Sequence, residues 1–161
     1  MIDISRINLF VFDFDGVLTD NKFYLNEDGV ESVKLSRSDG LAFDMLHSLK
    51  KKIIILSSEK NSIVSMRSKK LNVEAIHGIK NKDIILKNYC NENKIHLDDV
   101  FYVGNDINDL EAMKLCGYSA CPEDSREKIK KISSYCLNSS GGDGVIREII
   151  EHIFNIQTYS L

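Results

Sequence analysis

Two aspartates, Asp13 and Asp15, stand one residue apart, directly after an apolar run and before Gly16. An apolar run that ends in concentrated negative charge and a glycine turn is typical neither of a protein core nor of a solvated surface. Neighbouring carboxylates repel each other, and a divalent cation bound between them relieves that repulsion. The pair therefore predicts a metal-dependent active site in this segment.

Three further polar clusters also follow apolar runs. They are Ser57-Ser58-Glu59, Lys80-Asn81-Lys82-Asp83 and the segment from Gly104 to Asp109. In parallel α/β sheets, ligands bind beyond the carboxyl ends of the strands. We therefore expect all four clusters to surround one site. Taken alone, Asp106 and Asp109 could instead favour the N-terminus of a helix through its dipole.

Phosphoryl transfer suits this combination of residue types. Asp13, at the end of its strand, is the better-placed nucleophile toward phosphorus, and the aspartyl-phosphate it forms is then hydrolysed by water. Asp15 could protonate the leaving oxygen and then activate that water. Ser57 and Lys82 could bind the phosphoryl oxygens, where charge neutralisation matters most. A Mg²⁺ ion with oxygen ligands would bridge carboxylate and phosphate.

The elements that must position these residues alternate along the chain. Apolar runs that predict short buried strands are Ile7–Phe12, Ile53–Leu56, Val73–Ile76, Val100–Val103 and Tyr118–Cys121. Amphipathic patterns that predict helices are Leu41–Leu49, Ser62–Leu71, Lys82–Asn93, Leu110–Leu115, Arg126–Ile132 and Val145–Phe154. This order predicts an α/β fold, a mostly parallel sheet covered on both faces. Residues 21–36 break the rhythm and predict a β-hairpin around Asn26-Glu27-Asp28-Gly29.

Bulk composition narrows the class of protein. The 161 residues are 43% hydrophobic and 28% charged, and we expect one domain over residues 1–161. The net charge of −3 gives no reason to expect nucleic acid as a partner. No segment approaches the length of about 20 apolar residues that spans a membrane. The four cysteines form no C-x-x-C pair, which favours reduced thiols in a cytoplasmic protein.

These motifs resemble the haloacid dehalogenase phosphohydrolase superfamily. Asp13 to Thr19 matches its D-x-D-G-x-[LVT]-[TV] motif, Ser57 its second, Lys82 its third, and Gly104 to Asp109 its acidic fourth. The resemblance implies a Rossmann-like three-layer sandwich, a hairpin flap after the first strand and no cap domain. It also implies Asp13 as the nucleophile, Asp15 as the acid/base, and a magnesium site built from Asp13, the Asp15 carbonyl, Asn105 and Asp106. Gly16, Ser57, Ser58, Glu59 and Lys82 would bind phosphate or substrate.

One group within the superfamily is similar over most of the chain. It comprises capless phosphatases of 3-deoxy-2-ulosonic acid phosphates, which act on 3-deoxy-D-manno-octulosonate (KDO) 8-phosphate or on nonulosonate 9-phosphates of the sialic acid type. The similarity lies in the hairpin, in Ser38-Asp39-Gly40-Leu41 and in the C-terminal segment 141–161, with Gly141-Gly142-Asp143-Gly144 and Arg147. It implies a homotetramer with sites at subunit interfaces. The similarity also implies that Ser38 contacts substrate. Arg147, near a site at a subunit interface, could grip the substrate's carboxylate; otherwise Arg147 is a solvated helix residue.

Two residues depart from the usual pattern. Glu59 stands where the octulosonate phosphatases usually carry Gly-Arg after the hydroxyl, and this favours the nonulosonate 9-phosphates, because a carboxylate accepts hydrogen bonds from sugar hydroxyls. Asn105 replaces an aspartate of the fourth motif and removes one negative charge from the expected metal site. The alternative function is therefore a weakly active or inactive binding module associated with sialic-acid activation. A phospho-receiver domain fits less well, because its acceptor aspartate lies on a middle strand.

Overall fold

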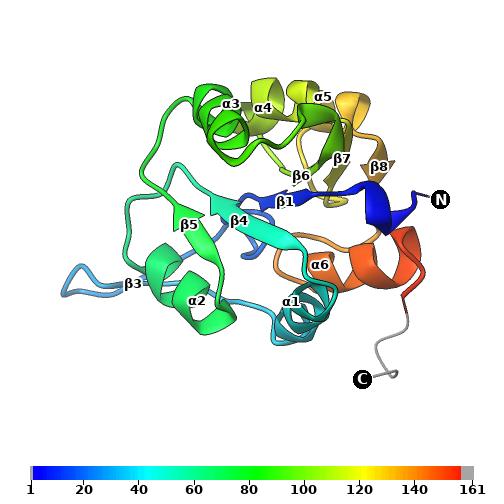
Figure 1. Ribbon diagram of the computed structural model, residues 1–161. Coiled ribbons are helices and arrows are strands. Elements are labelled where there is room, and N and C mark those ends of the chain that lie inside the picture. Colours follow the sequence, from blue (N-terminus) through cyan, green and yellow to red (C-terminus); the bar gives the residue numbers. More distant parts are fainter. Residues whose placement is uncertain (1, 157–161) are drawn as a thin grey trace.

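A six-stranded parallel sheet forms the centre of the molecule (Figure 1). Its order is β5-β4-β1-β6-β7-β8, and each neighbouring pair runs parallel. The strands are β1 Leu9–Phe12, β4 Lys52–Leu56, β5 Glu74–Ile76, β6 Val100–Val103, β7 Tyr118–Cys121 and β8 Tyr135–Cys136. The structure, a computed structural model, describes residues 2–156.

Helices cover both faces of this sheet. Figure 1 shows α1, α2 and α6 on one face and α3, α4 and α5 on the other. Their bounds are α1 Ser38–Ser48, α2 Ile63–Leu71, α3 Lys82–Asn93, α4 Leu110–Leu115, α5 Glu127–Ile132 and α6 Val145–Glu148. Short 3₁₀ turns lie at Ile4–Arg6, Leu97–Asp99 and Ile107–Asp109, and a π-helical segment, Ile149–Ile153, follows α6.

The central strand β1 shows why the layers form. Phe10 and Phe12 project into the core shared with α1 and α6, where the ring of Phe12 packs edge-on against Phe43 with centroids 5.4 Å apart. Leu9 and Val11 project into the second core, beneath α3 and α4. Because both faces are buried, the strand is apolar throughout instead of alternating with polar residues.

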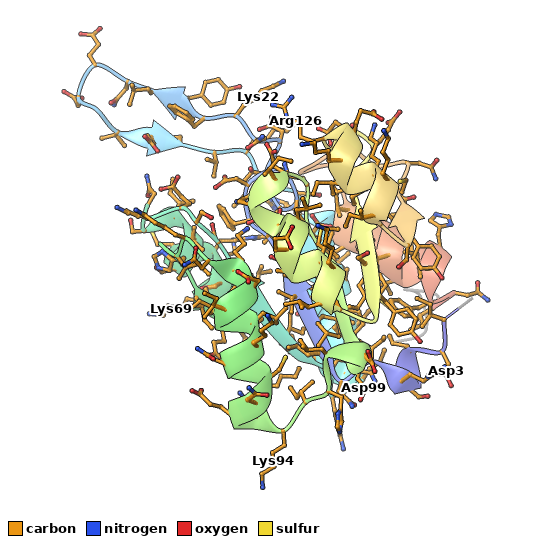
Figure 2. The ribbon with its side chains drawn as sticks, turned by 90° about the horizontal axis from the view of Figure 1, so that it is seen from above. Asp3, Lys22, Lys69, Lys94, Asp99 and Arg126 are labelled. Atoms are coloured by element: carbon orange, nitrogen blue, oxygen red, sulfur yellow. The ribbon has the colours of Figure 1, made fainter. Side chains whose placement is uncertain are left out.

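A two-stranded hairpin follows β1. Strands β2 (Tyr24–Leu25) and β3 (Glu31–Ser32) pair antiparallel and project away from the sheet and its helices (Figure 2). An isolated bridge between Thr19 and Leu35 closes its base. The α/β fold class, with its parallel sheet and hairpin flap, is therefore confirmed.

Some elements differ from the sequence expectation. Strand β8 was not expected, because Tyr135–Cys136 carries no apolar run and pairs only with β7. Helix α1 starts at Ser38 instead of Leu41, and the last helix changes to π-helical geometry after Glu148. Residues 157–161 of the expected C-terminal tail lie outside the described residues. Within the described part, none of the helices has both the length and the apolarity to cross a membrane.

Candidate active site

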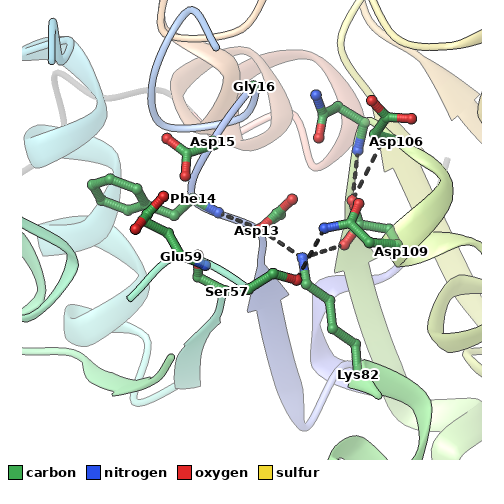
Figure 3. Close-up of polar contacts among 12 residues, drawn as sticks. Asp13, Phe14, Asp15, Gly16, Ser57, Glu59, Lys82, Asp106 and Asp109 are labelled. Atoms are coloured by element: carbon green, nitrogen blue, oxygen red, sulfur yellow. Dashed lines mark hydrogen bonds and ion pairs between the residues drawn. The ribbon is translucent and has the colours of Figure 1, made fainter. Parts of the chain in front are cut away.

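Asp13 and Lys82 form a buried ion pair at the carboxyl end of β1 (Figure 3). The ammonium of Lys82 lies 2.7 Å from Oδ1 of Asp13, and the backbone N–H of Phe14 donates to the same oxygen. Asp13 follows directly on β1, whereas Lys82 is the first residue of α3 and reaches back under the strand ends. Two residues 69 positions apart in the sequence are thus joined at one point of the sheet.

Asp109 shares the same ammonium. Its Oδ1 lies 2.7 Å from Lys82 Nζ, and its side chain is fully buried. Its Oδ2 accepts hydrogen bonds from the backbone N–H groups of Asn105 and Asp106. Asp109 therefore holds both the lysine and the loop after β6, and its carboxylate is turned away from the solvent.

The charges of this cluster do not balance. Burial and the Asp109 carboxylate raise the pKa of Asp13 well above its ordinary value, although Lys82 opposes them. Burial acts to lower the pKa of Lys82, but the two carboxylates outweigh it and raise that pKa, so the ammonium stays charged. One ammonium between two carboxylates leaves a surplus negative charge, which a further cation would neutralise.

Asp15 lies on the turn beyond Asp13, where Thr19 fixes its orientation. The Thr19 hydroxyl donates to Asp15 Oδ1 at 3.2 Å and accepts from the backbone N–H groups of Gly16 and Asn21. Burial is the main cause that raises the pKa of the Asp15 carboxyl. A carboxyl that keeps its proton more readily than usual is suited to act as an acid.

A cavity of about 410 Å³ opens above this cluster. Seven of the expected site residues line it: Asp13, Asp15, Ser57, Ser58, Glu59, Asn105 and Asp106. Asn108, from the expected Gly104–Asp109 segment, and Asn21, which the sequence did not single out, also line it. Lys82 lies beneath the floor and reaches the site through Asp13. The convergence expected from the strand ends therefore exists in space.

The strand-end segment after β4 supplies one wall of this cavity. Ser57 is buried, and its hydroxyl accepts from the backbone N–H of Glu59 at 3.1 Å. Ser58 accepts from the side-chain amide of Asn108 at 3.2 Å, which links this wall to the loop after β6. Glu59 is exposed at the rim, where its Oε1 accepts from the backbone of Lys60 and Asn61. A serine hydroxyl at the floor and a carboxylate at the rim are thus available to a bound molecule.

Asn105 supplies the observation that fits a metal ion. Its side-chain carbonyl oxygen, Oδ1, is buried and has no hydrogen-bond partner among the described residues. A buried acceptor without a partner is costly, and a bound cation would satisfy it. Together with Asp13 and Asp15, which line the same cavity, it offers only oxygen donors, the set that hard divalent cations prefer.

Asp106 is placed differently from Asn105. Its Oδ1 accepts from the backbone N–H of Ile107 and so caps the 3₁₀ turn, and its Oδ2 lies 3.5 Å from Arg126 Nε. The carboxylate lies at the edge of the cavity and is already engaged at both oxygens. Asn105 is therefore the better-placed ligand of the two.

Ser38 and Arg147 lie in a second cavity of about 560 Å³, apart from the first within one chain. The Ser38 hydroxyl is 2.7 Å from that of Ser36, and Arg147 forms an ion pair with Glu151. The structure therefore does not bring these two expected substrate-binding residues to the Asp13 cavity of the same chain. The expected roles of Ser38 in substrate binding and of Arg147 at a subunit interface stay predictions.

Asp109 was expected at the site only as part of the Gly104–Asp109 segment, and Tyr102 was not expected there. Taken alone, Asp109 was also consistent with a residue that favours the N-terminus of a helix. Tyr102 lies inside an apolar strand, and its hydroxyl donates to Asp109 Oδ1 at 2.9 Å. The spacing of Asp109 from Gly104 in the fourth motif could have indicated a role for Asp109 at the site. No feature of the local sequence indicates one for Tyr102.

Known proteins show the same fold and family. Residues 43–149 match the family model described as haloacid dehalogenase-like hydrolase. A putative hydrolase of this family from Streptomyces avermitilis superposes with a TM-score of 0.91 at 36% identity, covering 94% of this chain and 87% of its own. The 3-deoxy-D-manno-octulosonate 8-phosphate phosphatase of Moraxella catarrhalis, solved with magnesium, phosphate and KDO, superposes at 0.90 with 28% identity, covering 94% and 88%.

Two curated relatives extend the comparison. The 3-deoxy-D-manno-octulosonate 8-phosphate phosphatase of Salmonella typhi is 26% identical over 94% of this chain and 81% of its own length. N-acylneuraminate cytidylyltransferase A of Danio rerio is also 26% identical over 91% of this chain, which spans only 35% of that relative. The family match and the cluster at Asp13 agree with the hydrolase expected from the sequence. The chain belongs to the haloacid dehalogenase-like hydrolases.

Proposed function

We propose that this protein is a Mg²⁺-dependent phosphatase of phosphorylated 3-deoxy-2-ulosonic acids. The observation that carries the proposal is the placement of Asp13, whose carboxylate ends β1, contacts Lys82 at 2.7 Å and faces a cavity that it shares with Asp15 and Asn105. A nucleophile, a fixed ammonium and an acid/base candidate are the parts that phosphomonoester hydrolysis through an aspartyl-phosphate needs. The named relatives that hydrolyse KDO 8-phosphate support the same reaction class.

Each residue takes a role that its surroundings suit. Asp13 Oδ2, which accepts no hydrogen bond among the described residues, attacks phosphorus while Oδ1 stays bound to Lys82 and Phe14 N–H. Asp15, held by Thr19, protonates the leaving sugar oxygen and then takes a proton from the attacking water. Ser57 and Gly16, at the cavity floor and the turn, position the phosphoryl oxygens, and the buried Lys82 acts on them through its contact with Asp13.

Magnesium fits the oxygen donors of the site. Asp13, the Asp15 carbonyl and Asn105 would hold it, with Asp106 at the edge. When bound, it supplies charge neutralisation of the phosphoryl oxygens and lowers the pKa of the neighbouring carboxylates. The magnesium in the Moraxella catarrhalis phosphatase supports this choice of ion.

Two observations favour different sugars within one substrate class. The relatives named KDO 8-phosphate phosphatases favour the eight-carbon acid. Glu59 at the cavity rim favours the nonulosonate 9-phosphates, because its carboxylate can accept hydrogen bonds from the longer hydroxyl chain. The contact of Asp13 with Lys82 is intact, which supports an enzyme over an inactive binding module.

A homotetramer would close the open cavity. The hairpin carries exposed apolar side chains, with Tyr24 74% and Leu25 61% exposed, and such a patch is typical of an interface. In the proposed tetramer, Ser38 and Arg147 of one chain would contact a substrate bound by another. These contacts are part of the proposal.

Phosphate release tests the function directly. We expect hydrolysis of KDO 8-phosphate, N-acetylneuraminate 9-phosphate or 2-keto-3-deoxynonulosonate 9-phosphate with Mg²⁺, at least about 10³-fold slower for Asp13→Asn, because an amide is a far weaker nucleophile. The ratio of kcat/KM among the three substrates identifies the sugar. Equal rates for the native protein and Asp13→Asn would refute the enzyme.

A further inference from the structure

Tyr102 is a completely buried tyrosine in the middle of β6, between Phe101 and Val103. Its ring packs in the core beneath α3 and α4, and its hydroxyl donates a hydrogen bond to Oδ1 of Asp109 at 2.9 Å. Burial raises the pKa of this phenol well above its ordinary value. The hydroxyl therefore keeps its proton and acts as a fixed donor.

Asp109 receives four donors through two oxygens. Its Oδ1 takes the ammonium of Lys82 at 2.7 Å and the hydroxyl of Tyr102 at 2.9 Å. Its Oδ2 takes the backbone N–H of Asn105 at 3.0 Å and that of Asp106 at 3.4 Å. The four donors share the negative charge of this buried carboxylate, so its attraction for any one of them is weaker.

Lys82 divides its ammonium between two competing carboxylates. Nζ lies 2.7 Å from Asp13 Oδ1 and 2.7 Å from Asp109 Oδ1. Buried charges that lose a donor bind the remaining ones more strongly, because the interior offers no water as a substitute. If Asp109 lost the hydroxyl of Tyr102, Lys82 would move toward Asp109 and away from Asp13.

We propose that Tyr102 is a positioning residue of the phosphoryl-transfer site: by donating to Asp109, it keeps the Lys82 ammonium shared with the nucleophile Asp13. The effect reaches the reaction through Asp109 and Lys82, since Tyr102 does not line the cavity. The inference rests on the proposed phosphatase function for its kinetic consequence. The predicted position of the Lys82 ammonium can be tested without an activity assay.

The chain offers a matched control in Tyr89. This residue is 7% exposed, and its hydroxyl also donates to a carboxylate, Glu74 Oε2, at 2.8 Å. It lies on α3 but away from the cavity, with its partner on β5. Tyr89→Phe therefore removes the same group and the same kind of hydrogen bond without touching Asp109 or Lys82.

Kinetics of the full chain test the proposal. For Tyr102→Phe we expect kcat to fall about 10- to 100-fold, the range of a lost hydrogen bond to a charged group, while KM changes less than about twofold. For Tyr89→Phe both constants should stay within about twofold of the native protein. Equal losses in both variants, or no loss for Tyr102→Phe, would overturn the proposal.

A double-mutant cycle with Asp109→Asn tests whether Tyr102 affects the reaction through Asp109. If Tyr102 acts through Asp109, Tyr102→Phe should lower kcat no further in the Asp109→Asn background. Multiplicative losses would show that the tyrosine acts by another route and overturn the proposal. Tyr102→Phe alone could fold poorly, because it leaves the buried Asp109 carboxylate without one of its donors. In the Asp109→Asn background that charge is absent, so the double variant still tests the proposal.

A spectroscopic readout separates this inference from the function. The ammonium of Lys82 is buried, so its ¹H–¹⁵N NMR signal can be observed and assigned by its loss in Lys82→Arg. We expect the signal to shift in Tyr102→Phe and to stay unchanged in Tyr89→Phe. A shifted signal in a protein inactive toward every sugar acid phosphate supports the positioning role and rejects the proposed function. An unshifted signal rejects the positioning role alone, whatever the activity.

Discussion

Gly16 and Asn105 are in such close contact that a Cβ atom on Gly16 would lie 1.8 Å from Asn105 Nδ2. The glycine belongs to the turn after β1 and the asparagine to the loop after β6, so this contact joins the two segments that carry the oxygen donors. Gly16 also has φ +81°, which side chains rarely adopt. Gly16 of the first motif is thus needed both for the conformation of its own turn and for the close approach of the loop after β6.

Gly16→Ala should therefore displace Asn105 and impair magnesium binding and phosphate release. Gly29→Ala is the matched control, because Gly29 has φ +77° but a Cβ added there would have no atom within 4 Å. Both variants should lose about 1 kcal/mol of stability from the strained backbone. Only Gly16→Ala should lower kcat/KM, by at least about tenfold. Equal activity of the two variants in steady-state assays would contradict the role of this contact.

Asn105→Asp should strengthen magnesium binding. Asn105 Oδ1 is buried and has no hydrogen-bond partner among the described residues, and a carboxylate there would add one negative charge to the oxygen donors around the ion. We expect the dissociation constant for Mg²⁺, measured by isothermal titration calorimetry, to fall about tenfold or more. Asn108→Asp, at an exposed residue that lines the same cavity, is the control for a negative charge added at another position. No gain for Asn105→Asp would mean that the asparagine is already an adequate ligand.

Much of this site could be predicted from local sequence because each polar cluster follows its own apolar run. Strand ends of a parallel sheet meet at one edge, so Asp13, Ser57 and Asn105 had to converge. Tyr102 could not be predicted in the same way, because a tyrosine in an apolar strand has the pattern of a core residue, and only the tertiary fold shows that its hydroxyl meets Asp109. Strand β8 was missed for a related reason, since its pairing with β7 depends on contacts remote in sequence.

Asp39 shows a further contact that the sequence did not reveal. It lies on α1 and is fully buried, and its Oδ1 accepts from the backbone N–H groups of Ile146 and Arg147 at the start of α6. Its Oδ2 has no partner among the described residues. Burial is the main cause that raises the pKa of this carboxyl from 3.8 to about 6.

The raised pKa of Asp39 predicts a loss of stability as the pH rises. Between pH 3.8 and about 6 the folded chain holds this proton and the unfolded chain does not, so the free energy of unfolding falls across that interval and stays lower above it. Asp39→Asn keeps an acceptor for α6 but cannot ionise. The stability of the variant relative to the native protein should therefore rise by about 2 kcal/mol from pH 4 to pH 7 in urea unfolding. A difference that is constant with pH would contradict the assignment.

Replacing the exposed apolar residues of the hairpin should dissociate the proposed tetramer. Tyr24 and Leu25 are exposed on β2, and the hairpin that contains them projects from the molecule (Figure 2). Their change to aspartate therefore removes apolar contact area from an interface without disturbing the core. We expect light scattering to show monomers, with kcat/KM at least about tenfold lower for the sugar acid phosphate but within about threefold for p-nitrophenyl phosphate, which needs no neighbouring subunit. Leu49→Asp, an exposed apolar position at the C-terminal end of α1, is the control and should leave the assembly unchanged. A fully active native monomer would refute closure of the cavity by a second subunit.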